Sequence, residues 1–377
     1  MTIAIISMIR EPWGGSEELW YDMAKVALSQ NHKVIHLSYE HKTIDPKRKE
    51  LVGLGLIALQ RPGITNSQIS GLNRFIRLSI NYIRKKIRNP LQKLFDQNPD
   101  VILYNGTCYS IADEKTLLHQ LENFKGKFFL LAHFNERRTK SSKEVAEIVK
   151  QAYQKVEKKF FTNHKDIETV EKDLSYNIHN ALVVRNPVNL KDKTIVHYPQ
   201  EKIIQLAIVA NLLSVHKGQD IVLNILKNKT WKTRDWHLNI YGKGVDEKFL
   251  KDLASQNDLA EKVSFHGKVD DIRLLWQKNH ILLMPSRMEG MPLAIVEAML
   301  CGRPCVATNV GGISEWLEEN RSGFIAASAD EDSFGKALEK AWENKYKWEE
   351  MGKQAHERAM MLYDPHPGKT LLDLITK

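Results

Sequence analysis

Short apolar segments alternate with amphipathic helical patterns along almost all of this 377-residue chain, and this alternation limits the fold more than any other feature. Segments such as TIAIIS, KVIHLS and DVILYN are apolar at consecutive positions, so both faces of each strand are expected to be buried. Parallel sheets covered by helices have this pattern. The sequence therefore predicts an α/β fold with doubly wound sheets, and its length calls for two of them.

The predicted strands fall into two groups, separated by a polar, proline-containing stretch from Asn186 to Lys202. The strands before it are TIAIIS, KVIHLS, DVILYN, KFFLLAHF, KKFFTN and NALVVRN; those after it are IIQLAIVA, WHLNIYG, KVSFHG, HILLMPS and PCVATN. We therefore place the domain boundary between residues 188 and 189. Beyond about residue 345 the pattern is helical, broken at Asp364–Pro367.

Charge is distributed unevenly. Residues 1–188 carry the entire net charge of +9, and residues 61–100 alone hold 8 basic and 2 acidic side chains. The basic amphipathic stretch GLNRFIRLSINYIRKKIRNPLQKLF, in which Arg74–Arg88 supply most of the charge, suits an anionic membrane surface or a core helix with a solvated face. Three cysteines, no long apolar stretch and a start without signal-peptide features predict a cytoplasmic protein.

The segment PSRMEGMPLAIVEAMLCGRP, from Pro285 to Pro304, follows a predicted strand and opens a helix. Ligands bind at this edge of an open α/β sheet. With Pro292 at the first helical position, the free N–H groups of Leu293 and Ala294 would suit a phosphate.

Two carboxylates flank this helix start, Glu289 in the loop and Glu297 two turns into the helix. A carboxylate suits vicinal hydroxyls such as those of a sugar, although an acidic surface helix could show the same spacing by chance. With its surrounding residues, the pair resembles the Glu-x7-Glu signature of the family-4 retaining glycosyltransferases of the GT-B fold. The resemblance implies that Glu289 contacts the donor sugar and Glu297 the ribose. It also implies that the backbone between them, at Gly290, Met291, Pro292, Leu293 and Ala294, contacts the diphosphate and sugar.

The segment LAIVANLLSVHKGQD is predicted to form a second phosphate-binding turn. Lys217 supplies a mobile positive charge and Gly218 lets the backbone approach, unless Lys217 is simply a solvated helix lysine. Members of the resembled family usually have an arginine where this chain has Asn211, and that arginine and the lysine neutralise the diphosphate. Arg287 or His216 are candidates to supply the missing charge.

The segment EPWGGSEELWYDMA follows the first strand. Gly14 and Gly15 allow close backbone approach and Ser16 suits a helix N-cap, whereas the G-x-G-x-x-G pattern of nicotinamide cofactors is absent. The resemblance implies that this loop faces the donor phosphates and the acceptor, with Glu17 and Trp20 nearby. An ordinary strand-to-helix turn is the alternative.

His133 ends another predicted strand. A lone histidine is more often structural, but its position and the resemblance make a catalytic or substrate-binding role an equal alternative. Asn135 and Glu136 follow on the same loop. Asn105, Gly106 and Thr107 end a neighbouring strand and are candidates to line the acceptor cleft.

Two further loops match the family. Gly267, Lys268 and Val269 resemble its base-binding loop, and Gly311–Gly312 resemble a turn beside the nucleotide. No metal site is expected, because the only Asp-x-Asp, at Asp330–Asp332, lies at a predicted helix start where acids complement the dipole. The resemblance likewise implies metal independence and no cofactor besides the nucleotide sugar.

The resemblance implies two Rossmann-like domains facing a cleft: 1–188 for the acceptor, 189–354 for the nucleotide sugar, and a helix at about 355–377 that crosses back. It implies retaining transfer of a hexose, with glucose from UDP-glucose as the best guess, to a glycan or lipid-linked acceptor in polysaccharide or glycolipid biosynthesis. Arg74–Arg88 would contact the inner face of the membrane.

Three alternatives stay open. A non-catalytic nucleotide-sugar-binding scaffold is motivated by Asn211. A phosphorylase or sugar-nucleotide epimerase could share the fold. A nucleic-acid binder is motivated by the charge, but a recognition motif is absent and residues 189–377 are neutral, so we predict no nucleic-acid partner.

Overall fold

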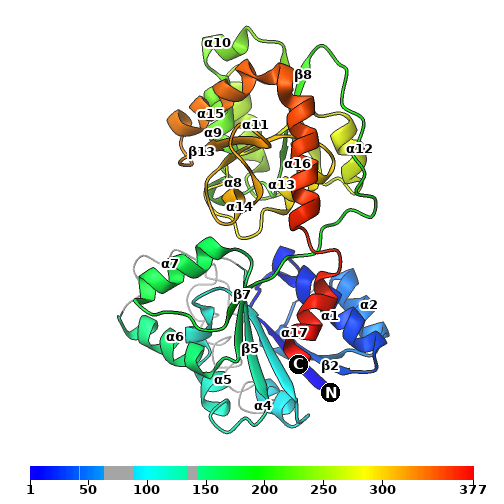
Figure 1. The fold of residues 1–377 in the computed structure, drawn as a ribbon, viewed down its shortest axis with the longest axis vertical. Helices are drawn as coiled ribbons and strands as arrows, with labels where there is room; N and C mark the ends of the chain where they lie inside the picture. Colours follow the sequence, from blue (N-terminus) through cyan, green and yellow to red (C-terminus); the bar gives the residue numbers. More distant parts are fainter. Residues whose placement is uncertain (42, 63–88, 134–142) are drawn as a thin grey trace, which may run out of the picture. The chain divides into compact units, whose positions relative to one another are not determined.

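The chain forms two compact units in the computed structural model, which describes residues 1–41, 43–62, 89–133 and 143–377. The first unit is Met1–Pro187 with Asp364–Lys377, and the second is Val188–Tyr363 (Figure 1). Each is built on a fully parallel sheet, so the predicted α/β class is confirmed. The whole of the basic stretch Arg74–Arg88, together with Asn135 and Glu136, lies outside the described residues.

The sheet of the first unit has seven strands in the order β3-β2-β1-β4-β5-β6-β7. Their bounds are β1 (Thr2–Ser7), β2 (Lys33–Tyr39), β3 (Ile57–Arg61), β4 (Val101–Gly106), β5 (Lys127–Ala132), β6 (Lys158–Phe161) and β7 (Ala181–Val183). The chain adds strands on one side of β1 and then on the other, so the strand order reverses between β1 and β4. Loops after these two strands therefore meet at the edge where such folds bind ligands.

Helices cover both faces of this sheet. Apolar side chains of α1 (Glu18–Ser29), α2 (Pro46–Gly53) and α17 (Pro367–Thr376) pack on one face. The other face is covered by α4 (Pro90–Phe95), η2 (Ser110–Asp113), α5 (Lys115–Gln120), α6 (Lys143–Lys155) and α7 (His164–Leu174).

The C-terminal helix α17 returns to the first unit and lies beside α1 (Figure 1). The expected crossover helix from about residue 355 is divided, since residues 355–362 belong to α16 (Trp348–Leu362) in the second unit. The break falls at Asp364–His366 because Pro367 begins a new helix and has no N–H to continue the old one. The Gly368 N–H donates to Asp22 Oδ2 at 2.9 Å.

Gly368→Ala should weaken the packing of α17 against α1. A Cβ at Gly368 would lie 2.5 Å from Asp22 C and Met23 N, which are backbone atoms and cannot give way. We expect a loss of about 1–3 kcal/mol in the free energy of unfolding of the first unit. Gly335→Ala is the matched control, because a Cβ there meets only Ile225 at 3.8–4.0 Å. Equal urea midpoints for the two variants would contradict the close packing of Gly368 against the α1 backbone.

The second unit has a six-stranded sheet in the order β10-β9-β8-β11-β12-β13. Its strands are β8 (Ile204–Val209), β9 (Trp236–Tyr241), β10 (Val263–Gly267), β11 (Ile281–Met284), β12 (Cys305–Thr308) and β13 (Gly323–Ala326). Here the order reverses between β8 and β11, which pair through Leu206 with Ile281 and Ala207 with Leu282.

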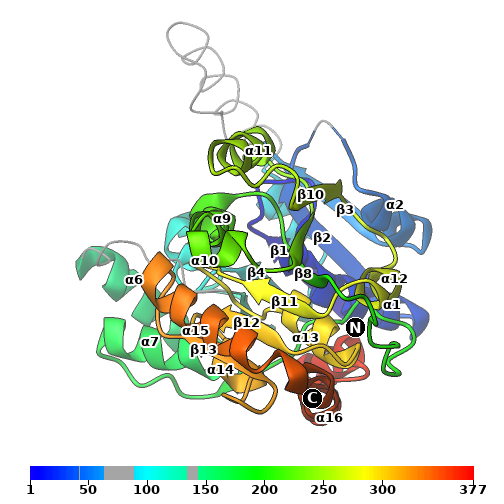
Figure 2. The ribbon, with the colours of Figure 1, turned by 90° about the horizontal axis from the view of Figure 1, so that it is seen from above.

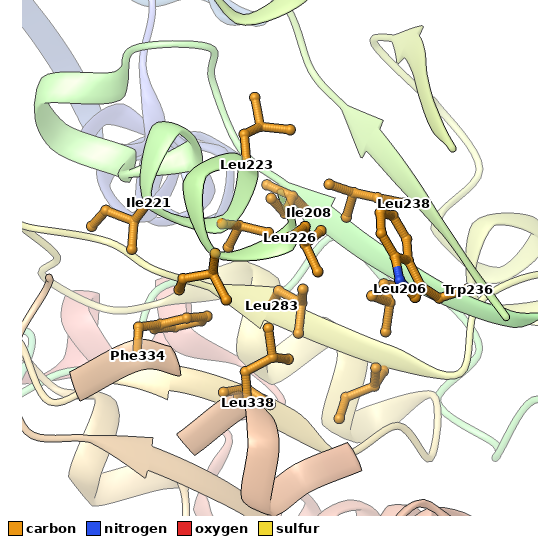
Figure 3. Packing of buried hydrophobic residues seen from close by; sticks show 14 of the residues in the cluster. Leu206, Ile208, Ile221, Leu223, Leu226, Trp236, Leu238, Leu283, Phe334 and Leu338 are labelled. Atoms are coloured by element: carbon orange, nitrogen blue, oxygen red, sulfur yellow. The ribbon is translucent and has the colours of Figure 1, made fainter. Parts of the chain in front are cut away.

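Two layers of helices enclose this second sheet (Figure 2). One contains α9 (Gln219–Leu226), α10 (Lys229–Lys232), α11 (Glu247–Gln256) and α15 (Glu331–Glu343). The other contains α12 (Ile272–Gln277), α13 (Leu293–Leu300), α14 (Ile313–Trp316) and α16. Figure 3 shows part of the first layer's core, where Leu206, Ile208, Leu238 and Leu283 from the strands lie near Leu226, Phe334 and Leu338 from the helices.

Some local expectations were wrong or incomplete. Strands β3 and β13 were not predicted; both lie at sheet edges, and β3 has alternate exposed residues instead of a continuous apolar run. Ser16 lies within the short 3-10 turn η1 (Gly15–Glu17) and caps no helix. Asp330 does cap α15 by accepting a bond from Ser333 N, as expected. Within the described parts of the chain, no helix is both long and apolar enough to cross a bilayer.

Candidate functional site

The loops after β8 and β11 interlock at the carboxyl edge of the second sheet. Gly218 has a positive φ of 65°, and a Cβ there would lie 2.1 Å from the Pro285 carbonyl oxygen. The backbone N–H groups of Arg287 and Met288 both donate to the carbonyl of His216, at 2.8 and 3.2 Å. Two segments predicted from separate motifs therefore form one continuous surface.

Lys217 and Glu289 form an ion pair at the centre of this surface. Lys217 ends the short helix α8 (Ser214–Lys217), and its Nζ lies 2.6 Å from Glu289 Oε1. Ser286 Oγ donates to the same oxygen at 2.7 Å. The Glu289 side chain is only 7 % exposed and that of Lys217 25 %, so the pair is shielded from solvent but still reachable.

Arg287 does not supply the positive charge that is missing at Asn211. Its guanidinium makes two bonds of 2.8 Å to the Asp220 carboxylate and a third to the Ser214 carbonyl. The bonds to Asp220 raise the Arg287 pKa above its ordinary value. Asn211 itself is exposed, and its carbonyl accepts a bond from Gln219. The charge of Arg287 is thus already neutralised within the loop.

The loop after β12 packs against the backbone of the Glu289 loop. Gly311, with φ 51°, packs so closely that a Cβ would lie 1.9 Å from the Glu289 carbonyl oxygen. Gly312 N–H donates to the Gly290 carbonyl at 3.1 Å. The Gly311–Gly312 turn, singled out from the sequence, therefore fixes the backbone of the Glu289 loop.

The start of α13 differs from the expected arrangement. Pro292 is the N-cap and the helix begins at Leu293, one residue later than predicted. The Leu293 N–H is not free, because it donates to the Met291 carbonyl at 3.0 Å.

Glu297 lies in the second turn of α13 and is 9 % exposed. Burial raises its pKa to about 7, and a hydrogen bond from the Asn189 backbone only partly opposes this effect. A buried carboxyl that can carry a proton is suited to binding a hydroxyl as either donor or acceptor.

The free energy of unfolding should depend on pH through Glu297. Because the folded-state pKa is raised, the stabilising contribution is complete at low pH and is lost as the pH rises through about 7. From about pH 5 to about pH 8 we expect wild type to lose about 2–3 kcal/mol relative to Glu297→Gln, which mimics the protonated form. Denaturant titrations across this range measure the difference. Parallel curves would contradict the raised pKa.

The loop after β10 also lies at this edge. Gly267 has φ 68°, and its carbonyl accepts a bond from Gly242 N–H at 2.7 Å. The preceding His266 stacks on Tyr241 with ring centroids 4.6 Å apart. Lys268 is exposed and Val269 half-buried, so this loop offers backbone groups and one mobile charge.

The first unit gathers its own candidates at the carboxyl edge of its sheet. Gly14 packs against Ile9, where a Cβ would lie 2.6 Å from Cδ1, whereas a Cβ at Gly15 would meet nothing within 4 Å. Glu17 and Trp20 are both buried. His133 directly follows β5 and is 5 % exposed, with Nε2 2.7 Å from Asn105 Oδ1.

Sequence reasoning missed three residues that these contacts reveal. Ser286 holds Glu289, Asp220 holds Arg287, and Ser7 binds Glu17. Ser286 is nearly fully buried two residues after β11, and a serine near a strand end within the quoted motif was the available signal. Among the described residues, no group of three or more His, Cys, Asp or Glu side chains could hold a metal ion.

The two-sheet architecture is similar to that of solved structures of the GT-B fold. The crystal structure of Anabaena HepE in complex with UDP and glucose superimposes with a TM-score of 0.72 over 99% of this chain and 98% of HepE, at 16% identity. Two Rossmann-like sheets of this kind define the GT-B fold. Residues 193–358 match the family described as "Glycosyl transferases group 1". The second unit is thus similar to the group 1 glycosyl transferases over 166 residues, less than half of the chain.

Curated relatives match part of the chain, and only in part of their own length. An uncharacterized glycosyltransferase of Haemophilus influenzae is 31% identical over 165 residues, which are 44% of this chain and 46% of the relative. The N-acetyl-alpha-D-glucosaminyl L-malate synthase of Bacillus anthracis is 29% identical over 169 residues, which are 44% of this chain and 42% of the synthase. The match therefore spans less than half the length of either relative.

Proposed function

We propose that the chain transfers a hexose from a nucleotide sugar, with a UDP-hexose as donor, to a glycan or lipid-linked acceptor. The observation that carries this proposal is the Lys217–Glu289 pair, held by Ser286 at the switch point of the domain that matches the family. A cation and a carboxylate in contact can bind the two halves of one donor, the diphosphate and the sugar. The complex of HepE with UDP and glucose supports UDP-glucose as the first donor to test.

In this proposal Lys217 binds the diphosphate and Glu289 accepts hydrogen bonds from the sugar hydroxyls. Glu297 binds the ribose, and Gly267–Val269 bind the base. The acceptor oxygen bonds to the anomeric carbon on the face that the diphosphate leaves, so the configuration is retained. The acceptor's proton passes to the departing diphosphate. Charge stabilisation by Lys217 would make a metal unnecessary, without help from the Leu293 N–H, which already donates to the Met291 carbonyl.

The ligand-free pairing has a direct consequence for donor binding. Lys217 Nζ already contacts Glu289, so a diphosphate must draw the ammonium away or share it. Once Lys217 moves, Glu289 keeps the Ser286 bond on Oε1 and can accept a hydrogen bond from a sugar hydroxyl. Binding of the diphosphate thereby prepares the carboxylate for the sugar.

Calorimetry of the full chain with UDP, GDP, ADP and their hexose conjugates, with and without a chelator, tests this function. We expect one UDP-hexose to bind with an affinity that the chelator does not change. Lys217→Ala should weaken UDP binding by about 1.5–3 kcal/mol, the range of a charged hydrogen bond. Lys248→Ala, which removes an exposed lysine on α11, is the matched control. Equal affinities of wild type and Lys217→Ala for UDP would remove Lys217 from the site.

One observation favours a second candidate, a nucleotide-sugar-binding scaffold without turnover. Asn211 brings no charge, and Arg287 is committed to Asp220, so the cations that face the diphosphate are reduced to Lys217 and the exposed loop lysines. Turnover separates the two functions, because a scaffold binds the donor and releases it unchanged.

A further inference from the structure

A chain of buried polar groups runs along the carboxyl edge of the first sheet. Asn105, on β4, donates from Nδ2 to Glu17 Oε1 at 2.7 Å. Ser7, at the end of β1, donates to the other oxygen of Glu17 at 2.9 Å. On its far side, Asn105 Oδ1 lies 2.7 Å from His133 Nε2. Glu17, Asn105 and His133 are each at most 5 % exposed, so water does not compete for these bonds.

The orientation of the Asn105 amide is fixed first by the Ser16 carbonyl, which can only accept. Nδ2 also lies 3.3 Å from the Ser16 carbonyl oxygen, which has no proton to give. A flipped amide would set its oxygen against that carbonyl and against the ionised form of Glu17, whose pKa burial raises to about 7. Asn105 therefore presents Oδ1 to His133, and an acceptor at this position requires a proton on Nε2.

The His133 ring is neutral and held in place. Burial lowers its pKa to about 4, so at neutral pH it carries a single ring proton. Its N–H backbone group donates to the Gly106 carbonyl at 3.1 Å, and its carbonyl accepts from Thr162 Oγ1 at 3.0 Å. Within the part of the chain that the structure describes, Nδ1 is buried and has no hydrogen-bond partner.

We propose that Glu17 and Asn105 are positioning residues for His133, holding its ring as the Nε2–H tautomer so that Nδ1 accepts a hydrogen bond from a substrate hydroxyl. The substrate part rests on the proposed transferase function; the tautomer does not. An unpaired acceptor buried at a ligand-binding edge costs stability unless a ligand completes it. A sugar or acceptor hydroxyl is the donor that such a site would take.

Nitrogen NMR on the full chain with labelled histidine tests the tautomer directly. His133→Gln assigns the ring by the loss of its signals. We expect the proton on Nε2 and a strongly downfield, unprotonated Nδ1. A wild-type ring with its proton on Nδ1, or one averaging between the two forms, would overturn the proposal whether or not the chain has transferase activity.

Variants of Glu17 test whether it holds the His133 tautomer through Asn105. Glu17→Leu removes the acceptor that orients Asn105, so the Nδ1–H form should become detectable, whereas Glu17→Gln can still accept from Nδ2 and should keep the wild-type spectrum. Thr162→Val is the matched control, because Thr162 contacts the His133 carbonyl and not its ring. If Glu17→Leu does not fold, Asn105→Ala gives the same readout. A wild-type tautomer in the leucine variant would remove Glu17 from this role.

Substrate binding tests the proposed hydrogen bond from a substrate hydroxyl to His133 Nδ1. Saturation with the donor and acceptor identified by turnover should move the Nδ1 resonance of His133, and kcat should fall in Glu17→Leu but persist in Glu17→Gln. An unmoved Nδ1 resonance in a turning-over enzyme would overturn the contact. If no nucleotide sugar is turned over, the proposed function fails, while the ligand-free spectrum still decides the tautomer.

Discussion

Glu289→Gln should lower sugar transfer by about 100-fold or more while leaving the chain folded. An amide can occupy the same space, but it loses the charge that strengthens hydrogen bonds to the sugar as charge develops at the anomeric carbon. Steady-state kinetics with the donor found by calorimetry measures this effect. Glu350→Gln is the matched control, since Glu350 is an exposed carboxylate on α16 away from the site loops.

The same variant should bind UDP more tightly than wild type does. In wild type a diphosphate competes with Glu289 for Lys217, whose Nζ lies 2.6 Å from the carboxylate. Removing the competing charge should raise UDP affinity by about two- to tenfold, the scale of one net hydrogen bond. Loss of transfer together with a gain in nucleotide affinity is difficult to produce by general damage. Wild-type turnover in Glu289→Gln would remove Glu289 from the sugar site.

Arg303→Met should produce the largest loss of stability. Arg303 is fully buried between α13 and β12, and its guanidinium donates to six backbone carbonyls, those of Val196, His197, Trp276, Asn279, Cys301 and Gly302. These carbonyls come from the segment that enters the second unit, the end of α12 and the turn after α13. Methionine fills similar space but leaves several of the oxygens without a donor.

We expect the free energy of unfolding of the second unit to fall by about 3–5 kcal/mol, with a drop in Tm of roughly 10 °C or more. Arg303→Lys should recover only part of this loss, because one ammonium cannot reach carbonyls on several sides. Arg321→Met is the matched control, because the Arg321 side chain is 67% exposed and forms an ion pair with Glu318, three residues earlier in the chain. Similar Tm values for Arg303→Met and Arg321→Met would contradict this structural role.

The sequence predicted the strands that are apolar at consecutive positions, because this pattern marks burial on both faces. Strands β1, β4, β8 and β11 are interior and apolar on both faces, and each was expected within a residue or two. Strand β3 was not expected, because alternate residues are exposed and it has no continuous apolar run. Strand β13 was missed although it is mostly buried, because its four residues, GFIA, give only a short apolar run. The division of the last helices was visible, since prolines mark it directly.

The site was predictable as a set of motifs but not as a set of contacts. Lys217 and Glu289 were each chosen for a role toward a ligand, and neither motif could show that they bind each other across 72 residues. Arg287 was a reasonable substitute for the charge missing at Asn211, yet its partner is set by the backbone position of Asp220. Such pairings depend on side-chain positions that only the folded loops define.

The most direct test of the central claim is to follow UDP-hexose turnover by the full chain in the presence of a chelator, with the anomeric configuration of the product read by proton NMR. The proposed function predicts release of UDP, a product with the donor's anomeric configuration, and loss of both in Glu289→Gln. Tight binding without any turnover would instead identify a scaffold. Failure to bind or turn over any nucleotide sugar, with the chain folded, would contradict the account.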